Sequence, residues 1–306
     1  MKAQNNQNGK SDIRADSGIL KYIPDTYRPY ALLARLDRPI GFWLLGLPGL
    51  WAIWLSSNGF SVKAVWLSAL FMIGAVAMRA AGCVINDIWD RDLDKKVERT
   101  AVRPLAAEDL SLKQAAVFLL VLLFIGLMIL MQMNVVTVVL GILSVPLIIA
   151  YPLMKRITFW PQAFLGLTFN FGVLMGWAAM TETLEAPTFL LYIGAIFWTI
   201  GYDTIYAHQD IEDDMLAGIK STALKFGDSS KQWVIGFYAL AFLFMLIAFA
   251  MQSVWGAIAL VPVAWHMSYQ ILKWDVDNTY TALQAFKSNR NCGLLILAAA
   301  LVVALV

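Results

Sequence analysis

Apolar segments of bilayer length recur along this chain, and they restrict it to a helical membrane protein. A bilayer core requires about 20 mostly apolar residues for each helix that crosses it. Of the 306 residues, 60% are hydrophobic and only 14% are charged, which is too apolar for an ordinary soluble domain. The segments predict nine spans, at residues 39–57, 64–86, 114–132, 135–152, 160–180, 187–206, 232–251, 254–272 and 291–306. We therefore expect an all-α fold with nine transmembrane helices.

The distribution of Lys and Arg predicts the orientation of these spans, because cytoplasmic loops carry an excess of basic residues. With the N-terminus inside, every Lys and Arg except Lys63 and Arg79 falls on the cytoplasmic side. Residues 1–17 are polar and lack the apolar core of a signal peptide, so we interpret them as a disordered cytoplasmic tail. Residues 18–306 are expected to form a single transmembrane domain. The predicted location is a bacterial inner membrane, with the mitochondrial inner membrane as the alternative.

Charge and rare residue types exclude several classes of protein. The formal net charge is +2, and the basic residues are spread over short loops, so we expect no nucleic-acid partner. Cys83 and Cys292 lie inside apolar segments, which indicates neither a disulfide framework nor a zinc site. His208 and His266 lack the spacing of metal ligands or a catalytic dyad. The remaining polar chemistry lies in two acidic segments.

The first acidic segment is "CVINDIWDRDLDKK", where a predicted span leaves the membrane on the cytoplasmic side. In a helix, a step of four residues turns only about 40° past a full turn. Asn86, Asp90 and Asp94 are therefore expected along one face, and Asp87 borders that face.

A second acidic segment, "DTIYAHQDIEDDMLAG", follows the sixth predicted span. Helical spacing predicts that Asp203, Tyr206, Asp210 and Asp214 share one face there. Three pairs of positions match at one constant offset: Asn86 with Asp210, Asp90 with Asp214, and Arg79 with Asp203. This pattern indicates a weak internal repeat and two similar helix bundles that face one another, although the coincidence could be chance.

The two acidic stripes predict a metal site. Clustered carboxylates repel one another unless a cation compensates them. Oxygen ligands without His or Cys select hard ions such as Mg²⁺, which fills its remaining positions with water and phosphate oxygens. Two facing stripes would hold a diphosphate through two Mg²⁺ ions. An isolated Asp at a helix end is more often a solvated boundary residue, but two matching stripes on one membrane side favour the metal hypothesis.

Several charged residues have two interpretations. Arg79 and Asp203 lie deeper than the stripes, and they either pair across the bundle or line the cavity floor. Lys155, Arg156 and Lys220 could bind diphosphate, although the basic bias of cytoplasmic helix ends also explains them. The same bias explains most basic residues between the second and third spans, Arg103 among them, although "ERTAVRPL" could form part of a lid.

Four segments carry a resemblance to a known family: "RLDRPIGFWLL", "MRAAGCVINDIWDRDLDKKVERTAVRPL", "YPLMKRITFWPQAFLG" and "GYDTIYAHQDIEDDMLAGIKSTALKFG". Together they resemble the UbiA superfamily of intramembrane prenyltransferases, specifically its 4-hydroxybenzoate polyprenyltransferase branch. The resemblance extends from about Arg35 to Gly227. It implies nine helices around a central cavity that is open sideways to lipid and capped on the cytoplasmic side.

The resemblance also implies an activity and its substrates. A polyprenyl group would move from a polyprenyl diphosphate to the ring carbon ortho to the hydroxyl of 4-hydroxybenzoate, with release of diphosphate, in ubiquinone biosynthesis. Alternatives are another aromatic acceptor, such as homogentisate or dihydroxynaphthoate, and an ion-coupled transporter. Membrane lipid would surround the enzyme, and the sequence indicates no protein partner.

The family's motifs imply a role for each candidate residue. The Mg²⁺ ligands would be Asn86, Asp87, Asp90, Asp94, Asp210 and Asp214, and the diphosphate would contact Lys155, Arg156 and Lys220. Arg35 would bind the acceptor's carboxylate, with Arg38 as a competitor, and Tyr206 and Tyr151 could orient the acceptor or stabilise positive charge. Catalysis is expected to depend most on Asp90, Asp210, Lys155 and Arg156.

Overall fold

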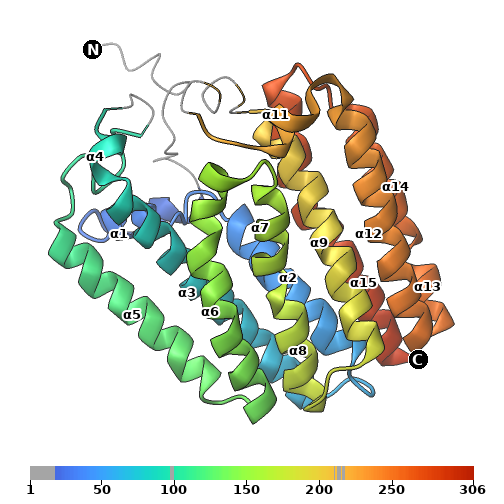
Figure 1. The fold of residues 1–306 in the computed structure, drawn as a ribbon. Helices are drawn as coiled ribbons and strands as arrows, with labels where there is room; N and C mark the ends of the chain where they lie inside the picture. Colours follow the sequence, from blue (N-terminus) through green and yellow to red (C-terminus); the bar gives the residue numbers. More distant parts are fainter. Residues whose placement is uncertain (1–17, 97–99, 210, 212–214, 216–217) are drawn as a thin grey trace. The chain divides into compact units, whose positions relative to one another are not determined.

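The computed structural model describes residues 18–96, 100–209, 211, 215 and 218–306, and every regular element in this part of the chain is helical (Figure 1). The elements are η1 (Gly18–Tyr22), α1 (Arg28–Leu33), α2 (Ile40–Leu55), α3 (Val62–Trp89), α4 (Arg91–Asp94), α5 (Leu112–Leu130), α6 (Val135–Ile157), α7 (Pro161–Phe169), α8 (Phe171–Thr181), α9 (Ala186–Ala207), α11 (Thr222–Phe226), η2 (Gly227–Ser229), α12 (Ser230–Gln252), α13 (Val254–Ala259), α14 (Val261–Lys273) and α15 (Thr279–Leu305). The predicted tail, residues 1–17, lies outside the described residues, as do Asp210 and Asp214 of the second acidic segment.

The described helices include seven that are long and apolar enough to cross a membrane. They are Val62–Trp89, Leu112–Leu130, Val135–Ile157, Pro161–Thr181, Ala186–Ala207, Thr222–Gln252 and Thr279–Leu305. The predicted first span corresponds to the shorter helix α2, and the predicted eighth span is divided at Leu260 between α13 and α14. Pro262, in the first turn of α14, has no N–H to continue the preceding helix. The all-α membrane fold is confirmed, and the count of nine spans stays a prediction.

The residues cluster into two compact units, and each is described by itself. Unit 1 consists of the described part of Met1–Trp43 together with Ile73–Ile129, and unit 2 consists of Leu44–Met72 and Leu130–Val306. The first acidic segment therefore belongs to unit 1, whereas the residues that lead to the second belong to unit 2. The single domain expected over residues 18–306 stays a prediction.

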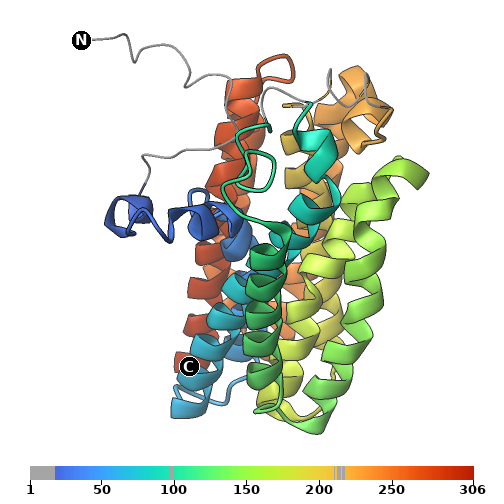
Figure 2. The ribbon, with the colours of Figure 1, turned by 90° about the vertical axis from the view of Figure 1, so that its left-hand side faces the viewer.

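In unit 1, α5 runs alongside the second half of α3 (Figures 1 and 2). The two helices approach closely because glycine faces the partner: a Cβ at Gly126 would lie 2.7 Å from Met78 Sδ. Gly74 faces Ile129 in the same antiparallel sense. Small residues that let helix backbones approach are typical of membrane helix pairs. This packing fixes the end of α3, which carries the first acidic segment.

In unit 2, α9 packs against α7, α12 and α15. Its buried Trp198 donates from Nε1 to Asn289 Oδ1 of α15 at 2.9 Å. A polar group inside a membrane protein needs such a partner, because lipid offers none. Gly201 makes room for Tyr238 of α12, whose ring carbon would lie 2.4 Å from an added Cβ. These contacts hold the end of α9 that leads to the second acidic segment.

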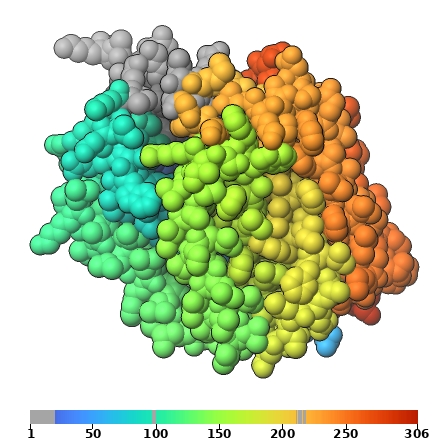
Figure 3. All heavy atoms as spheres, viewed as in Figure 1, coloured from blue at the N-terminus to red at the C-terminus, as the bar shows by residue number. Residues whose placement is uncertain are grey.

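The outward face of α6 is apolar. Ile142, Leu143 and Ile149 are all exposed, and Figure 3 shows the side chains of α6 covering part of the viewed surface. Exposed aliphatic side chains on a membrane-length helix suit contact with lipid chains. α6 begins after Asn134, whose Oδ1 accepts from the Thr137 N–H at 3.0 Å, so the predicted separation of residues 114–132 from residues 135–152 is confirmed.

Candidate active site

The first acidic segment keeps the helical register predicted for it. α3 ends at Trp89, Asp90 bends the chain, and α4 follows. The Asp90 N–H still donates to Asn86 O at 2.9 Å, and the Asp94 N–H donates to Asp90 O at 2.7 Å. Because these i to i−4 bonds continue through the bend, Asn86, Asp90 and Asp94 remain in helical succession.

The carboxylates of this segment differ in burial. Asp87 is 1% exposed and Asp94 is 7% exposed, whereas Asn86 is exposed and Asp90 is half-buried. Asp87, which the sequence places at the border of the stripe, is therefore more buried than the stripe residues. A buried carboxylate needs a nearby cation or several hydrogen-bond donors to remain charged.

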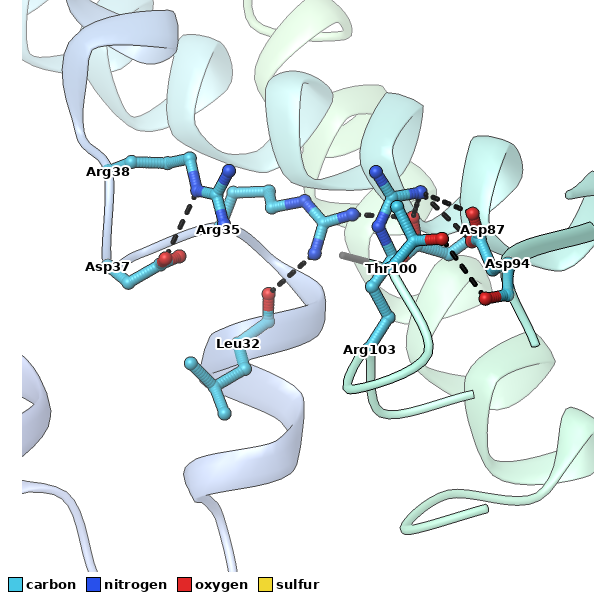
Figure 4. A network of polar contacts seen from close by, with 8 residues as sticks. All are labelled: Leu32, Arg35, Asp37, Arg38, Asp87, Asp94, Thr100 and Arg103. Atoms are coloured by element: carbon cyan, nitrogen blue, oxygen red, sulfur yellow. Dashed lines mark hydrogen bonds and ion pairs between the residues drawn. The ribbon is translucent and has the colours of Figure 1, made fainter. Parts of the chain in front are cut away.

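Two arginines supply that compensation (Figure 4). Arg35 donates from Nη2 to Asp87 Oδ1 at 2.6 Å. Arg103 Nη1 contacts both oxygens of Asp94, at 2.9 and 3.1 Å, and reaches Asp87 Oδ1 at 3.5 Å. The side chains of Arg35 and Arg103 are only 11% and 17% exposed. One guanidinium therefore joins two carboxylates that stand seven positions apart.

The path of the chain after α1 directs Arg35 toward α3. Arg35 has φ 58, a left-handed conformation that costs a residue with a side chain about 1–2 kcal/mol. Its N–H donates to Leu32 O at 3.0 Å, which closes the turn. Further along, Gly41 lies against the Arg79 guanidinium, because a Cβ there would be 2.5 Å from Arg79 Nε. The strained backbone of Arg35 is of a kind that is typical of functional sites.

The structure separates the two arginines that the sequence left as alternatives. Arg38 donates from Nε to Asp37 Oδ2 at 3.1 Å, whereas Arg35 reaches Asp87 of the acidic segment. Arg35 is thus part of the carboxylate network, and its role toward an acceptor stays a prediction.

Arg103 is a site residue that sequence reasoning missed. It lies in the loop between α4 and α5, where Thr100 Oγ1 donates to Asp94 O at 3.0 Å and the Arg103 N–H donates to Thr100 O at 2.9 Å. Leu105 and Leu110 are buried against α3 and α5. The apolar residues after Arg103 are the signal that could have indicated a packed loop instead of a solvated one.

The predicted diphosphate-binding lysines of unit 2 are adjacent. The Lys220 N–H donates to Lys155 O at 2.9 Å, and Lys220 Nζ donates to Ile157 O at 3.1 Å. Lys155 and Arg156 are exposed at the end of α6. A lysine that donates to the last carbonyls of a helix also stabilises that helix end. Lys220 therefore has a structural contact that does not depend on a ligand.

The end of α9 carries Asp203 and Tyr206, both partly buried, and the Tyr206 ring packs against Phe286 with centroids 4.3 Å apart. Arg79 and Asp203 belong to different units, so their pairing stays a prediction. The same holds for the facing of the two acidic segments, because Asp210 and Asp214 lie outside the described residues.

His208 follows α9 and is 5% exposed, and its ring contacts Trp274 edge-on at 5.2 Å. Burial lowers its pKa, and the charge of Asp277 opposes that shift in part. A neutral, packed imidazole accounts for these contacts.

The donor set of the first segment suits a hard cation. In the described part of the chain, no group of three or more His, Cys, Asp or Glu side chains is placed to hold a metal ion. Asp87 and Asp94 nevertheless already share one cationic group, that of Arg103, and their donors are all oxygen. Carboxylate oxygens are ligands that Mg²⁺ prefers, whereas a thiophilic metal prefers sulfur ligands.

Comparisons with known proteins agree with this fold. A model of the UbiA prenyltransferase family matches residues 45–302. The rat 4-hydroxybenzoate polyprenyltransferase, mitochondrial, is 43% identical over 96% of this chain and 79% of its own length. The human protein of the same description is 45% identical over 92% of this chain and 76% of its own length. Both relatives thus cover nearly the whole chain.

A solved structure shares the fold. A UbiA homologue from Archaeoglobus fulgidus, bound to GPP and Mg²⁺, superimposes with a TM-score of 0.68 over 90% of this chain and 99% of that protein, at 17% sequence identity. At this identity the likeness shows the fold alone.

The comparisons also correct the predicted location. The curated relatives are mitochondrial proteins, which contradicts a bacterial inner membrane. Span length and basic bias could not distinguish the two, because both features report a bilayer and its sidedness and not the organelle.

Proposed function

The chain belongs to the UbiA prenyltransferase family, and we propose that it transfers the polyprenyl group of a polyprenyl diphosphate to 4-hydroxybenzoate in ubiquinone biosynthesis. The observation that carries this proposal is the identity of 43–45% with 4-hydroxybenzoate polyprenyltransferases over more than nine-tenths of the chain. The complete first acidic segment supports it, since no ligand type of that motif is replaced. The enzyme acts in a mitochondrial membrane.

The leaving diphosphate requires positive charge around it. Mg²⁺, when bound, stabilises the negative charge that develops on the departing oxygen. The residues that would hold it in this chain are Asn86, Asp87, Asp90, Asp94, Asp210 and Asp214. Lys155, Arg156 and Lys220 bind the diphosphate directly, and the adjacency of Lys220 and Lys155 supports a common role.

The acceptor then attacks through its ring. As the carbon–oxygen bond to diphosphate breaks, the allylic carbon becomes electron-deficient, and the ring carbon ortho to the phenolic hydroxyl forms the new carbon–carbon bond. Loss of the proton from that ring carbon restores aromaticity. Apolar walls exclude water, which would otherwise capture the electron-deficient carbon. In this proposal Tyr206, whose ring packs against Phe286 at the end of α9, orients the acceptor ring or stabilises positive charge.

Arg35 binds the carboxylate of the acceptor in this proposal. A guanidinium has five N–H donors, so a second carboxylate can bind Arg35 while the contact with Asp87 persists. This arrangement would place the acceptor beside the first acidic segment, where the prenyl carbon becomes reactive.

The test is a prenyl-transfer assay with membranes, labelled 4-hydroxybenzoate, a polyprenyl diphosphate and Mg²⁺. We expect product with the native chain, and at least a 100-fold lower rate with Asp90→Ala, with Asp210→Ala or with excess chelator. Activity that survives all three treatments would reject the metal mechanism. Parallel assays with homogentisate and dihydroxynaphthoate test the acceptor, and prenylation of either in preference to 4-hydroxybenzoate would overturn the substrate assignment.

A further inference from the structure

We infer that Arg103 is the resident counter-cation of the first acidic segment, and that a divalent metal ion must displace its guanidinium from Asp87 and Asp94 in order to bind there. This inference rests on the proposed function, because it takes these carboxylates as metal ligands. Arg103 is thus a competitor, inside the protein itself, of the metal ion for these two carboxylates.

The geometry places the Arg103 guanidinium where the two carboxylates meet. Its Nη1 lies 2.9 Å from Asp94 Oδ2 and 3.5 Å from Asp87 Oδ1 (Figure 4). Charge-assisted contacts of this kind between buried groups are stronger than those between exposed groups. Because Arg103 engages both oxygens of Asp94 and lies farther from Asp87, a metal ion that joins the two carboxylates competes with Arg103 at Asp94 above all.

The charges of the network explain why exchange is needed. Arg35 and Arg103 carry two positive charges, and Asp87 and Asp94 carry two negative charges, so these four side chains are together neutral. A divalent ion that joined these carboxylates while both guanidinium groups stayed in place would lie beside two positive charges, and this local excess of positive charge is unfavourable. Displacement of Arg103 toward an incoming phosphate group relieves that excess, because the guanidinium exchanges one anion for another.

Arg103 is better placed to exchange than Arg35. Arg35 contacts one of the two carboxylates, Asp87, and its contact at 2.6 Å is shorter than the 3.5 Å contact of Arg103 with the same oxygen. Arg103 contacts both carboxylates, so a metal shared by them competes with Arg103 first.

The part of the loop from Arg103 to Leu110 stays in place during this exchange. Leu105 and Leu110 both lie in the loop shortly before α5, and they are 2% and 5% exposed. The Leu110 N–H donates to Pro104 O at 3.2 Å. Lifting the loop would expose this apolar contact, whereas rotation about the Arg103 side-chain bonds would not. The exchange is therefore a side-chain movement on a fixed loop.

The experiment measures binding of Mn²⁺ alone to the purified full-length protein in lipid nanodiscs, without diphosphate, by electron paramagnetic resonance. We expect Arg103→Gln to bind Mn²⁺ about tenfold more tightly than the native chain, because the internal competitor is gone. In excess chelator, the same variant should unfold at a lower temperature, because Asp94 then lacks the guanidinium of Arg103 and Asp87 keeps only that of Arg35. The two effects have opposite signs, which a merely structural role of Arg103 would not produce.

A matched control lies in the same loop. Glu108 accepts from Lys95 at 2.5 Å on the exposed side of the loop, so Glu108→Gln removes an ion pair without touching the carboxylate network. This variant should leave the affinity for Mn²⁺ unchanged. Arg103→Lys keeps the charge but loses the planar guanidinium, and it should bind Mn²⁺ with intermediate affinity, which provides a second test if Arg103→Gln does not fold.

The outcomes separate the inference from the proposed function. Equal or weaker Mn²⁺ binding by both Arg103 variants would overturn the inference while leaving the metal site intact. If Asp94→Asn bound Mn²⁺ as tightly as the native chain, the metal site itself would be wrong, and the inference would fail with it. Added pyrophosphate should tighten Mn²⁺ binding more in the native chain than in Arg103→Gln. Only in the native chain can the Arg103 side chain move from the carboxylates to the pyrophosphate.

Discussion

Asp87 and Asp94 show how single residues create the need for a cation at this membrane boundary. Both carboxylates are buried, and each is stabilised by an arginine that comes from another segment of unit 1. Removing one member of a buried ion pair leaves the other charge uncompensated, and this costs more than the pair itself contributes. The arginines and carboxylates of this network therefore depend on one another.

Asp87→Asn tests that dependence. The substitution keeps the size of the side chain but removes the charge that faces Arg35 and Arg103, so we expect a loss of stability of about 3 kcal/mol. Prenyl transfer should fall at least about 100-fold. Asp92→Asn is the control, because Asp92 lies in the same segment with its side chain 81% exposed, and both measurements should stay near the native values. Thermal unfolding in nanodiscs and the labelled-acceptor assay provide the two measurements.

Two substitutions of Arg35 separate the strain of its left-handed backbone from the stabilisation that its ion pair with Asp87 provides. Arg35→Ala and Arg35→Gly both remove the contact with Asp87, but only glycine relieves the left-handed conformation. We expect Arg35→Gly to be about 1 kcal/mol more stable than Arg35→Ala. Glu182 has φ 64 at the end of α8, so Glu182→Gly reports the backbone effect alone. Equal unfolding temperatures for the two Arg35 variants would show that the backbone there is not strained.

For single residues, the sequence predicts the positions of the carboxylates better than it predicts which arginines contact them. The helical spacing of Asn86, Asp90 and Asp94 follows from period alone, and the structure keeps it. Arg103 has no period that relates it to Asp87, and the basic bias of cytoplasmic loops makes every loop arginine look alike. Only the folding of the loop onto α3 selects Arg103, and that packing is a tertiary property.

Among the elements, the contact of α2 with α8 shows why glycines recur in the spans. A Cβ at Gly176 would lie 2.4 Å from the carbonyl oxygen of Gly49, and a backbone atom cannot rotate away as a side chain can. The contact between α2 and α8 is therefore set by two residues without side chains. Helix positions can be predicted from apolar length, but the distance between two helices depends on such pairs.

Gly176→Ala should destabilise unit 2 by about 1–3 kcal/mol, because α2 and α8 must separate to admit the methyl group. Gly236→Ala in α12 is the matched control, because a Cβ at Gly236 would meet no neighbouring atom of the described residues within 4 Å. This control should be neutral or slightly stabilising, since alanine is the better helix former. Unfolding temperatures in nanodiscs provide the comparison, and an equal response of both variants would argue against close α2–α8 packing.

For the whole molecule, apolar length and charge bias predicted the all-helical membrane fold, and the family motifs predicted the enzyme class. Helix ends were less predictable where a proline or a bend interrupts a span, as at Pro262 and Asp90. The predicted bacterial location was wrong, because the sequence features used for it are common to many membranes. The single site that the two acidic segments are predicted to share belongs to this scale.

A double-mutant cycle between Asp90 and Asp210 tests it directly. If both segments hold the same metal-bound diphosphate, either substitution alone disables the site, and the second adds little further loss. We expect Asp90→Asn and Asp210→Asn each to lower the rate of prenyl transfer about 100-fold or more. The rate of the double variant should be within about tenfold of the rate of the less active single variant. Asp92→Asn combined with Asp210→Asn provides the control, because an exposed residue outside the stripe should leave the effect of Asp210→Asn unchanged. Losses that multiply in the Asp90 and Asp210 cycle would mean that the segments act independently, and the shared diphosphate site would then have to be abandoned.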